Sequence, residues 1–351
     1  MIVMKLSDIG EFGLIERIRE AGARSASRAL IGIGDDAAAL LVDPGEALLA
    51  TTDLLLEGVH FDLRTTDLYS LGWKSAAANL SDIAAMGGLP RYCLTALGIP
   101  VSFTVEALAE FYRGLRACLG KFGTEVVGGD TCRSRRGFCI GVTLLGETRE
   151  GRAVTRRGAA PGDRIFVTGT LGGSGAGLEL LQKNVRRKTS GGRGKGKAQS
   201  AIRKLIERHL RPVPRVNEGI QLAGSGAVSA MIDVSDGLSS DLGHICDESC
   251  VGAEVHAGRI PLSRELRAAA SLLARPELDL ALFGGEDYEL LFTVPPEQVA
   301  RLRSLPVRAA EIGVVTPGAG MILVDERGRR SSLSPAGYDH FKRSSRRRNP
   351  R

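Results

Sequence analysis

Acidic residues that stand beside Gly, Ser or Thr just after apolar runs are the part of this sequence best suited to chemistry. We expect them at the ends of strands and in the turns that follow, where α/β proteins build sites. The arrangement occurs in six short segments. Mg²⁺ takes carboxylate and other oxygen ligands, and neighbouring glycines let backbone N–H groups approach phosphate oxygens. The pattern therefore indicates a site for magnesium and a polyphosphate. Its acids are Asp35, Asp36, Asp53, Asp82, Asp130, Asp233, Asp236, Glu286 and Asp287.

Each acid taken alone has an ordinary structural explanation, because Asp is common in turns and at helix N-caps. Asp236 followed by Gly237, for example, is by itself a turn signal. The repetition of the pattern is what favours a functional site. None of the His or Cys residues has the sequence context of a nucleophilic triad, and no Cys-x-x-Cys zinc pattern occurs.

Two glycine-rich segments resemble phosphate-binding loops. Residues 191–197 (GGRGKGK) fit the start of the P-loop pattern, but Ala198 stands where the pattern needs a hydroxyl for Mg²⁺. Residues 168–177 (TGTLGGSGAG) miss the dinucleotide-binding spacing. We interpret the second segment as either a tight turn or a helix N-terminus that binds an anion.

The net charge of +7 suggests a nucleic-acid-binding protein until its distribution is considered. Residues 183–204 carry nine Lys or Arg and residues 342–351 carry six, and neither segment has an acid. Without these fifteen charges the remainder of the chain is at −8. The acidic body and its aromatic-free basic segments make nucleic acid an unfavoured partner.

Hydrophobic periodicity predicts alternating helices and strands in both halves of the chain. Helices are expected over residues 7–21, 67–86 and 104–122, from about 175 and after 238. Strands are expected over 48–52, 92–99, 138–145, 164–168, 228–234, 288–294 and 321–324. A turn-rich stretch predicts a domain boundary near residue 150.

These elements predict a mixed α+β (α/β) protein of two domains, residues 1–150 and 151–341. We expect a flexible basic loop over 183–200 and a disordered basic tail over 342–351. No apolar run reaches the length of a membrane-spanning helix, and the N-terminus lacks a signal-peptide pattern. A soluble, cytoplasmic protein with reduced cysteines is expected.

The acidic motifs, taken together and in order, resemble those of thiamine-monophosphate kinase. That family belongs to the ATP-binding superfamily that includes aminoimidazole ribonucleotide synthetase and selenophosphate synthetase. The matching segments span nearly the whole chain. They are EFGLI (11–15), GIGDDAA (32–38), TTD (51–53), GVHF (58–61), NLSDIAAMGG (79–88), GGDT (128–131), VTGT (167–170), HLRPVPR (209–215), IDVSDGLSSDLGHI (232–245), GGEDYELLFTV (284–294) and GYDHF (337–341).

The resemblance implies ATP-dependent phosphorylation of thiamine monophosphate to thiamine pyrophosphate by direct in-line transfer with several Mg²⁺ ions. Such transfer depends on positioning and charge neutralisation, so no covalent nucleophile is expected. The resemblance also implies a two-domain fold like that of aminoimidazole ribonucleotide synthetase. In that fold the N-terminal sheets of a homodimer form a barrel across the two-fold axis.

The roles of individual residues follow from the resemblance, which alone chooses Asp36 over Asp35. It implies magnesium ligands at Asp36, Thr51, Thr52, Asp53, Asp82, Asp130, Asp233 and Asp236. It implies ATP contacts at Gly129, Asp130, Arg156 and Ser235, and substrate contacts at His60, Glu286 and Phe341. The alternatives are another ATP-using member of the superfamily, or a nucleic-acid-binding protein that uses the basic loop and tail.

Overall fold

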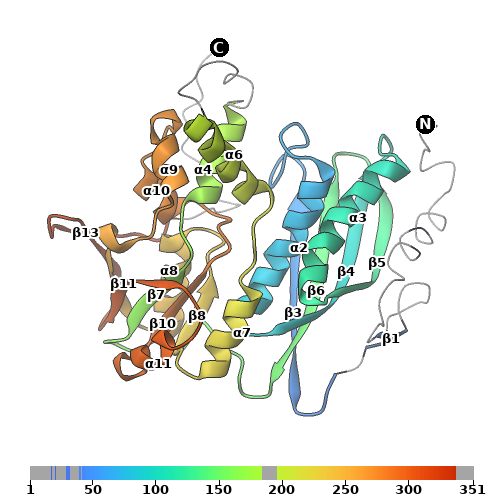
Figure 1. Ribbon diagram of the computed structural model, residues 1–351. Helices are drawn as coiled ribbons and strands as arrows, with labels where there is room; N and C mark the ends of the chain where they lie inside the picture. Colours follow the sequence, from blue (N-terminus) through green and yellow to red (C-terminus); the bar gives the residue numbers. More distant parts are fainter. Residues whose placement is uncertain are drawn as a thin grey trace.

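The computed structural model describes residues 42–183 and 196–336, with Arg17, Glu20 and two short strands, β1 (Ala29–Ile31) and β2 (Ala39–Leu40). The chain forms two halves that lie side by side, each a sheet with helices packed on it (Figure 1). None of the described helices is long and apolar enough to cross a bilayer.

The N-terminal half contains a four-stranded sheet with the order β3-β6-β4-β5. β6 is antiparallel to both of its neighbours, whereas β4 and β5 are parallel. The strands are β3 (Glu46–Leu56), β4 (Leu89–Pro100), β5 (Glu125–Ser134) and β6 (Cys139–Arg149). β3 and β5 are therefore the two opposite edges of this sheet.

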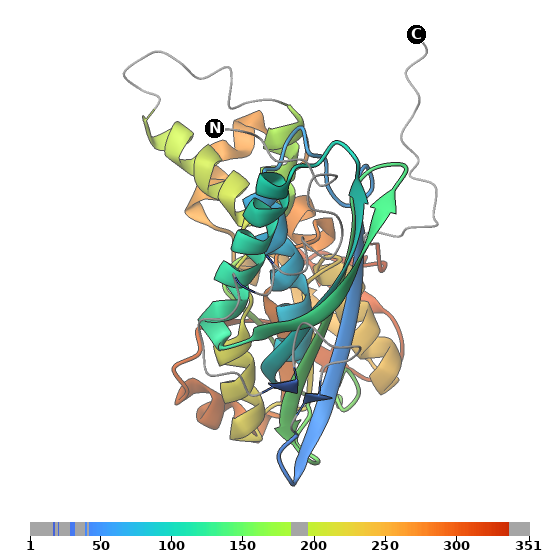
Figure 2. The same cartoon turned by 90° about the vertical axis from the view of Figure 1, so that its right-hand side faces the viewer.

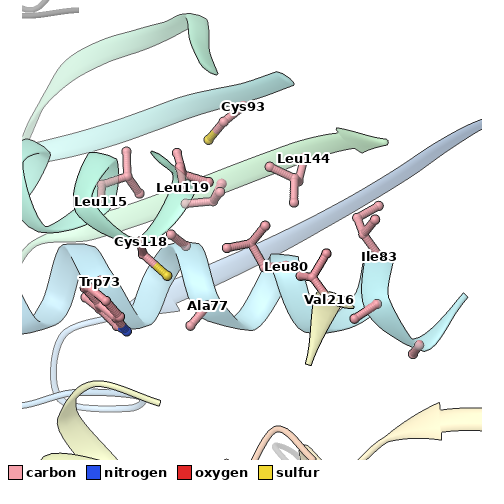
Figure 3. Packing of buried hydrophobic residues seen from close by; sticks show 14 of the residues in the cluster. Trp73, Ala77, Leu80, Ile83, Cys93, Leu115, Cys118, Leu119, Leu144 and Val216 are labelled. Carbon is pink, nitrogen blue, oxygen red and sulfur yellow. The ribbon is translucent and has the colours of Figure 1, made fainter. Parts of the chain in front are cut away.

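Helix α2 (Leu68–Ala85) is the central helix of the molecule and carries one of the acidic motifs. Asp67 caps it by accepting a hydrogen bond from the Ser70 N–H at 2.7 Å. Its alanines favour helix and allow close packing. The helix is buried along almost its whole length between the sheet, α3 (Val105–Leu119) and α7 (Val216–Ser225), as Figure 3 shows.

Two glycines allow α2 and α3 to approach closely. A Cβ atom on Gly72 would lie 2.0 Å from the Phe111 carbonyl oxygen, and one on Gly114 would lie 1.8 Å from the Tyr69 carbonyl oxygen. Both distances are far inside van der Waals contact, so any side chain at either position would separate the helices. The close packing fixes α2 against the sheet and with it the acidic motif near its C-terminus.

α2 and α3 cover one face of the four-stranded sheet (Figure 2). On the other face, Leu48 is 49% exposed and Leu54 is 60% exposed. The four described strands form an open sheet, and no closed barrel is present in this part of the chain. Exposed leucines on one face of a sheet suit contact with a second subunit, and a homodimer is expected from the sequence.

The C-terminal half is built on a seven-stranded sheet with the order β13-β12-β9-β11-β7-β10-β8. The strands are β7 (Arg164–Thr168), β8 (Ala230–Asp233), β9 (Gly252–His256), β10 (Leu290–Val294), β11 (Ala309–Thr316), β12 (Met321–Val324) and β13 (Arg330–Ser332). The helices are α4 (Gly173–Gln182), α6 (Gly196–Leu210), α7, α8 (Leu238–Ser249), α9 (Arg264–Ala269), α10 (Glu277–Phe283) and α11 (Val299–Arg303).

The sequence located the main elements but misplaced two acids. Asp53 and Asp130 were expected in turns after strands, yet both lie within strands, β3 and β5. β5 itself was not predicted, because its glycines and polar residues hide the alternation of a strand. The predicted helix over 7–21 falls almost entirely outside the described residues.

The basic loop expected over 183–200 does not extend to residue 200. Residues 196–200 form the first turn of α6, and residues 184–195 lie outside the described part of the chain. Three of the six cysteines are buried, and all six are free thiols. The tail 342–351 also lies outside the described residues.

Candidate active site

Two cavities meet where the two halves of the molecule come together. The larger has a volume of about 670 Å³ and the smaller about 440 Å³. Asp82 and Asp233 line both of them, so the two cavities share an acidic wall. Asp82 comes from α2 of the N-terminal half, and Asp233 ends β8 of the C-terminal half.

Asp82 and Asp233 of the shared wall and Asp53 of the larger cavity are three crowded carboxylates that are largely removed from water, and together we call them the acidic wall. Thr51 donates a hydrogen bond to Asp82 (Oγ1 to Oδ2, 2.5 Å), and Ser81 donates one to the buried Asp233 (Oγ to Oδ2, 2.8 Å). Burial, and then the charge of Asp82, raises the pKa of Asp53 to about 6 and that of Asp233 to about 7. Burial also raises the pKa of Asp82. Bringing cations to this wall would relieve the repulsion.

The turn after β8 is held by a carboxylate that sequence reasoning missed. The backbone N–H groups of Asp236 and Gly237 donate to Oδ2 of Asp241 at 3.2 and 3.0 Å. Asp241 is buried, and burial followed by the charge of Asp233 raises its pKa well above the usual value. This side chain orients the turn that places Ser235 and Asp236 in the larger cavity.

The segment between α10 and β10 has an unusual backbone. Glu286 and Tyr288 have φ values of +65° and +51°, in the left-handed region that residues with a side chain seldom occupy. Hydrogen bonds tie it to the turn after β8: Glu286 N–H donates to the Ser235 carbonyl at 2.7 Å, and Tyr288 N–H to the Val234 carbonyl at 2.9 Å. Backbone strain of this kind is concentrated at functional sites.

Asp287 has a structural role at the start of α4. Its carboxylate accepts hydrogen bonds from the backbone N–H groups of Gly172 (2.5 Å) and Ser174 (3.0 Å). The chain's own carboxylate therefore occupies the helix N-terminus for which the sequence left an anion-binding alternative open.

Glu289 connects the HLRPVPR segment (209–215) to the segment between α10 and β10. It is buried and accepts hydrogen bonds from Arg215 through both of its oxygens, each at 2.7 Å. Arg208 donates to it at 2.8 Å and Thr168 at 2.7 Å. A carboxylate with this many charged partners is a structural group, and Glu289 fixes the base of the 284–289 loop.

The larger cavity also receives residues from β3 and from the turn that follows it. Asp53, Thr52 and His60 line it. The Leu56 N–H donates to His60 Nδ1 at 3.0 Å, and the Thr52 hydroxyl donates to the Val142 carbonyl at 3.1 Å. Arg156 is exposed and lines the smaller cavity, where its charge acts on Asp82 and Asp233.

The structure thus brings most of the expected site residues together around the two cavities. Those residues are Thr51, Thr52, Asp53, His60, Asp82, Arg156, Asp233, Ser235, Asp236 and Glu286. Gly129 and Asp130 are not among them, since they are exposed on β5 at the opposite edge of the sheet from β3. Asp36 and Phe341 lie outside the described residues.

Metal ligands were expected among these acids, but they do not form a complete protein cage. Within residues 42–183 and 196–336, no three acidic, His or Cys side chains converge closely enough to enclose a metal ion. The grouping of Asp53, Asp82 and Asp233 is therefore an open acidic wall. Such a wall could hold a cation only together with oxygens from elsewhere.

Known protein families and relatives match nearly the whole chain. Family models of the AIR synthase related protein match residues 34–148 (N-terminal domain) and 160–326 (C-terminal domain). The thiamine-monophosphate kinase of Aquifex aeolicus (strain VF5) is 38% identical over 338 residues, covering 96% of this chain and 100% of that relative.

Solved structures agree with the sequence relatives. The crystal structure of thiamine-monophosphate kinase from Stenotrophomonas maltophilia K279a superposes with a TM-score of 0.77 at 38% identity, covering 90% of this chain and 96% of that one. A structure described as AaThiL complexed with AMPPCP and TMP has a TM-score of 0.74 at 36% identity, covering 97% and 100%.

The family models assign both halves of the chain, and with them the four-stranded and the seven-stranded sheet, to the AIR synthase related proteins. Within this class the full-length similarity is to enzymes that use ATP. The chain belongs to the thiamine-monophosphate kinase family. The resemblance seen in the motifs is confirmed, and so is the mixed α/β two-domain fold.

Proposed function

We propose that this protein transfers the γ-phosphoryl group of ATP to thiamine monophosphate, giving thiamine pyrophosphate and ADP. The observation that carries the proposal is the pair of cavities sharing Asp82 and Asp233. Two phosphorylated ligands can approach each other across this wall. A relative of the same family has been crystallised with AMPPCP and TMP, which supports the same pair of ligands here. We place the reaction in the cytoplasm, where both substrates would be supplied.

The smaller cavity suits the nucleotide. Arg156 lines it, and a guanidinium forms bidentate hydrogen bonds with phosphate oxygens. The larger cavity suits thiamine monophosphate, because it combines apolar side chains such as Leu55 and Phe283 with the polar His60 and Glu286. Phe341 is proposed to stack on a ring of the thiamine. Ser235 lines the larger cavity two residues after the shared Asp233, and we propose that it contacts ATP from there.

Mg²⁺ is the proposed cofactor, and the residues present fit it. Mg²⁺ keeps much of its hydration and is usually held by one or two carboxylates together with substrate phosphates, so an open acidic wall is the suitable kind of site. The ligands we propose are Asp36, Thr51, Thr52, Asp53, Asp82, Asp130, Asp233 and Asp236. When bound, the ions would offset the charge of the two phosphates in the transition state.

The proposed role of Asp130 requires a second subunit. Among the described strands, β3 and β5 are the two edges of the open sheet, and Asp130 is on β5 whereas Asp53 is on β3. If the two-fold axis runs along the barrel, closing two such sheets places the β5 edge of one subunit beside the β3 edge of the other. We therefore propose a homodimer in which Gly129 and Asp130 of the partner subunit complete the nucleotide site. The exposed Leu48 and Leu54 support this face as the interface.

The test is direct. Purified protein is incubated with ATP, thiamine monophosphate and Mg²⁺, and thiamine pyrophosphate is measured by chromatography. We expect product only when all three are present. An Asp82→Asn variant is expected to retain its circular dichroism spectrum and lose nearly all turnover. A folded wild-type protein that forms no thiamine pyrophosphate would overturn the proposed reaction.

A further inference from the structure

A lysine is buried in the centre of the molecule, beside the larger cavity. Lys74, on α2, is 5% exposed. Its Nζ lies 2.6 Å from Oε2 of Glu286 and 3.5 Å from Nε2 of His209. Lysine is seldom buried without a partner, because removing an ammonium group from water is costly. The partner here is an acid from the strained loop of the other half of the molecule.

His209 supports this pair from α6. It is 6% exposed, and its Nδ1 lies 3.0 Å from the Ser174 hydroxyl and 3.4 Å from Glu286 Oε2. Burial, and then the charge of Lys74, lowers its pKa to about 3, so the ring is neutral near pH 7. With Nε2 facing an ammonium group, the ring proton belongs on Nδ1, where it can be donated to Ser174 or Glu286.

Glu286 is held in a single orientation by these contacts. Its side chain is 31% exposed and lines the larger cavity. Burial acts to raise its pKa, but the charge of Lys74 and the hydrogen bond from it act in the opposite direction, and the resulting pKa is below the usual value. Lys74 donates to Oε2, and His209 lies beside the same oxygen, so both contacts are made to one oxygen of the carboxylate. These contacts fix the carboxylate while its side chain still lines the cavity.

We propose that Lys74 is a positioning residue which, with His209, orients Glu286 to bind the thiazolium and aminopyrimidine part of thiamine monophosphate. This inference rests on the proposed role of Glu286 as a substrate contact. A carboxylate suits both a cationic ring and an amino group that donates hydrogen bonds. Lys74 does not line the cavity, so it acts through Glu286 without contacting the substrate.

The arrangement also links the two halves of the molecule. Lys74 belongs to α2, which carries Asp82 in the acidic wall, whereas Glu286 belongs to the loop before β10. A purely structural role for Lys74 predicts a loss of stability with no selective effect on either substrate. A positioning role predicts an effect on thiamine monophosphate that depends on Glu286. The two roles are therefore separable by kinetics.

The experiment is a double-mutant cycle on the full-length enzyme, comparing Lys74→Met, Glu286→Gln and the double variant in saturating Mg²⁺. The KM for thiamine monophosphate is measured at saturating ATP, and the KM for ATP at saturating thiamine monophosphate. We expect Lys74→Met to raise the KM for thiamine monophosphate about tenfold or more, as for the loss of a charge-assisted hydrogen bond, with little change in the KM for ATP. In the Glu286→Gln background, Lys74→Met should add little, because the group it orients has already been altered. Lys74→Arg should recover part of the affinity.

The control is Lys204→Met, which removes another lysine that pairs with a glutamate, Glu265, at 2.7 Å on the surface. Its KM values should match the wild type. If Lys74→Met does not fold, Lys74→Arg and the double variant, which retains no unpaired charge, complete the comparison. Equal effects of Lys74→Met with and without Glu286→Gln, or equal effects on both substrates, would overturn the proposal. An unchanged KM in Glu286→Gln alone would instead reject Glu286 as a substrate contact, and the inference with it.

Discussion

At the scale of single residues, repulsion among the carboxylates of the acidic wall destabilises the free protein and favours the binding of a cation. Asp53, Asp82 and Asp233 are crowded and partly or fully buried, and the resulting rise in their pKa shows that the protein disfavours all three charges at once. A cation placed among them would reverse this preference. These residues therefore lower the stability of the free protein and raise the stability of the cation-bound protein.

This electrostatic conflict predicts how stability depends on pH in the absence of metal. Because the folded state raises the pKa of Asp233 to about 7, it binds the proton more tightly than the unfolded chain does. The contribution to stability is therefore complete below about pH 4 and is lost as the pH rises through about 7. We expect the melting temperature of EDTA-treated wild type to fall over this range relative to Asp233→Asn.

Thermal melts of the two proteins over a series of pH values provide the measurement. Mg²⁺ added near neutral pH should raise the melting temperature of the wild type more than that of Asp233→Asn. If the difference between the two proteins is the same at every pH, the protonation of Asp233 does not cause the loss of stability.

At the scale of secondary-structure elements, the position of the site depends on the close contact of α2 with α3. Gly114 has no room for a Cβ, which would lie 1.8 Å from the Tyr69 carbonyl oxygen. We expect Gly114→Ala to lower the free energy of unfolding by about 1–3 kcal/mol, as overpacking does in protein cores. Urea denaturation followed by circular dichroism measures the change.

Gly120→Ala is the matched control, because this glycine has an ordinary helical backbone and nothing within 4 Å of its added Cβ. Its stability should equal or slightly exceed that of the wild type. A Gly114→Ala protein as stable as the control would mean that the helices separate without cost.

The same elements show how far the sequence could be interpreted. Helix α2 was predicted to within a residue of its ends, since Asp67 caps an alanine-rich run. Strand β5 was missed because Gly129 and its neighbours give no alternating pattern; Gly129 is needed where a Cβ would lie 2.0 Å from the Thr95 carbonyl. The pairing of Lys74 with Glu286 joins residues 212 positions apart, and no local pattern can reveal such a contact.

Candidate site residues were predicted better than their supporting groups. The motifs named the acids of the wall, whereas Asp241, Lys74 and His209 were not proposed for any role. A lysine within the apolar, alanine-rich α2 was the one available signal, because a charge in a buried helix needs a partner. The supporting contacts come from elements that only the tertiary fold brings together.

At the scale of the whole molecule, the two edges of the N-terminal sheet predict how subunits share a site. Asp53→Asn and Asp130→Asn should each be nearly inactive alone. If each site combines Asp53 with the partner's Asp130, a mixed dimer of the two variants contains one intact site. Equal co-expression should then restore about a quarter of the wild-type activity, the statistical expectation for a symmetric dimer.

The control pairs Asp53→Asn with Asp82→Asn, two acids of the same wall in one subunit. Every mixed dimer then has damage in both sites, and no activity should return. Failure of the first pair to recover activity would place Asp130 in a different arrangement from the one proposed.

The sharing of Asp82 and Asp233 by two cavities also has a consequence for isotope exchange. If both substrates occupy the protein together and the phosphoryl group passes directly between them, no phosphorylated enzyme accumulates when one is missing. Labelled ADP should then enter the ATP pool only when the thiamine esters are present. Exchange with ATP and ADP alone would indicate a covalent phospho-enzyme. The geometry of one wall thus predicts whether half of the reaction can proceed without the other.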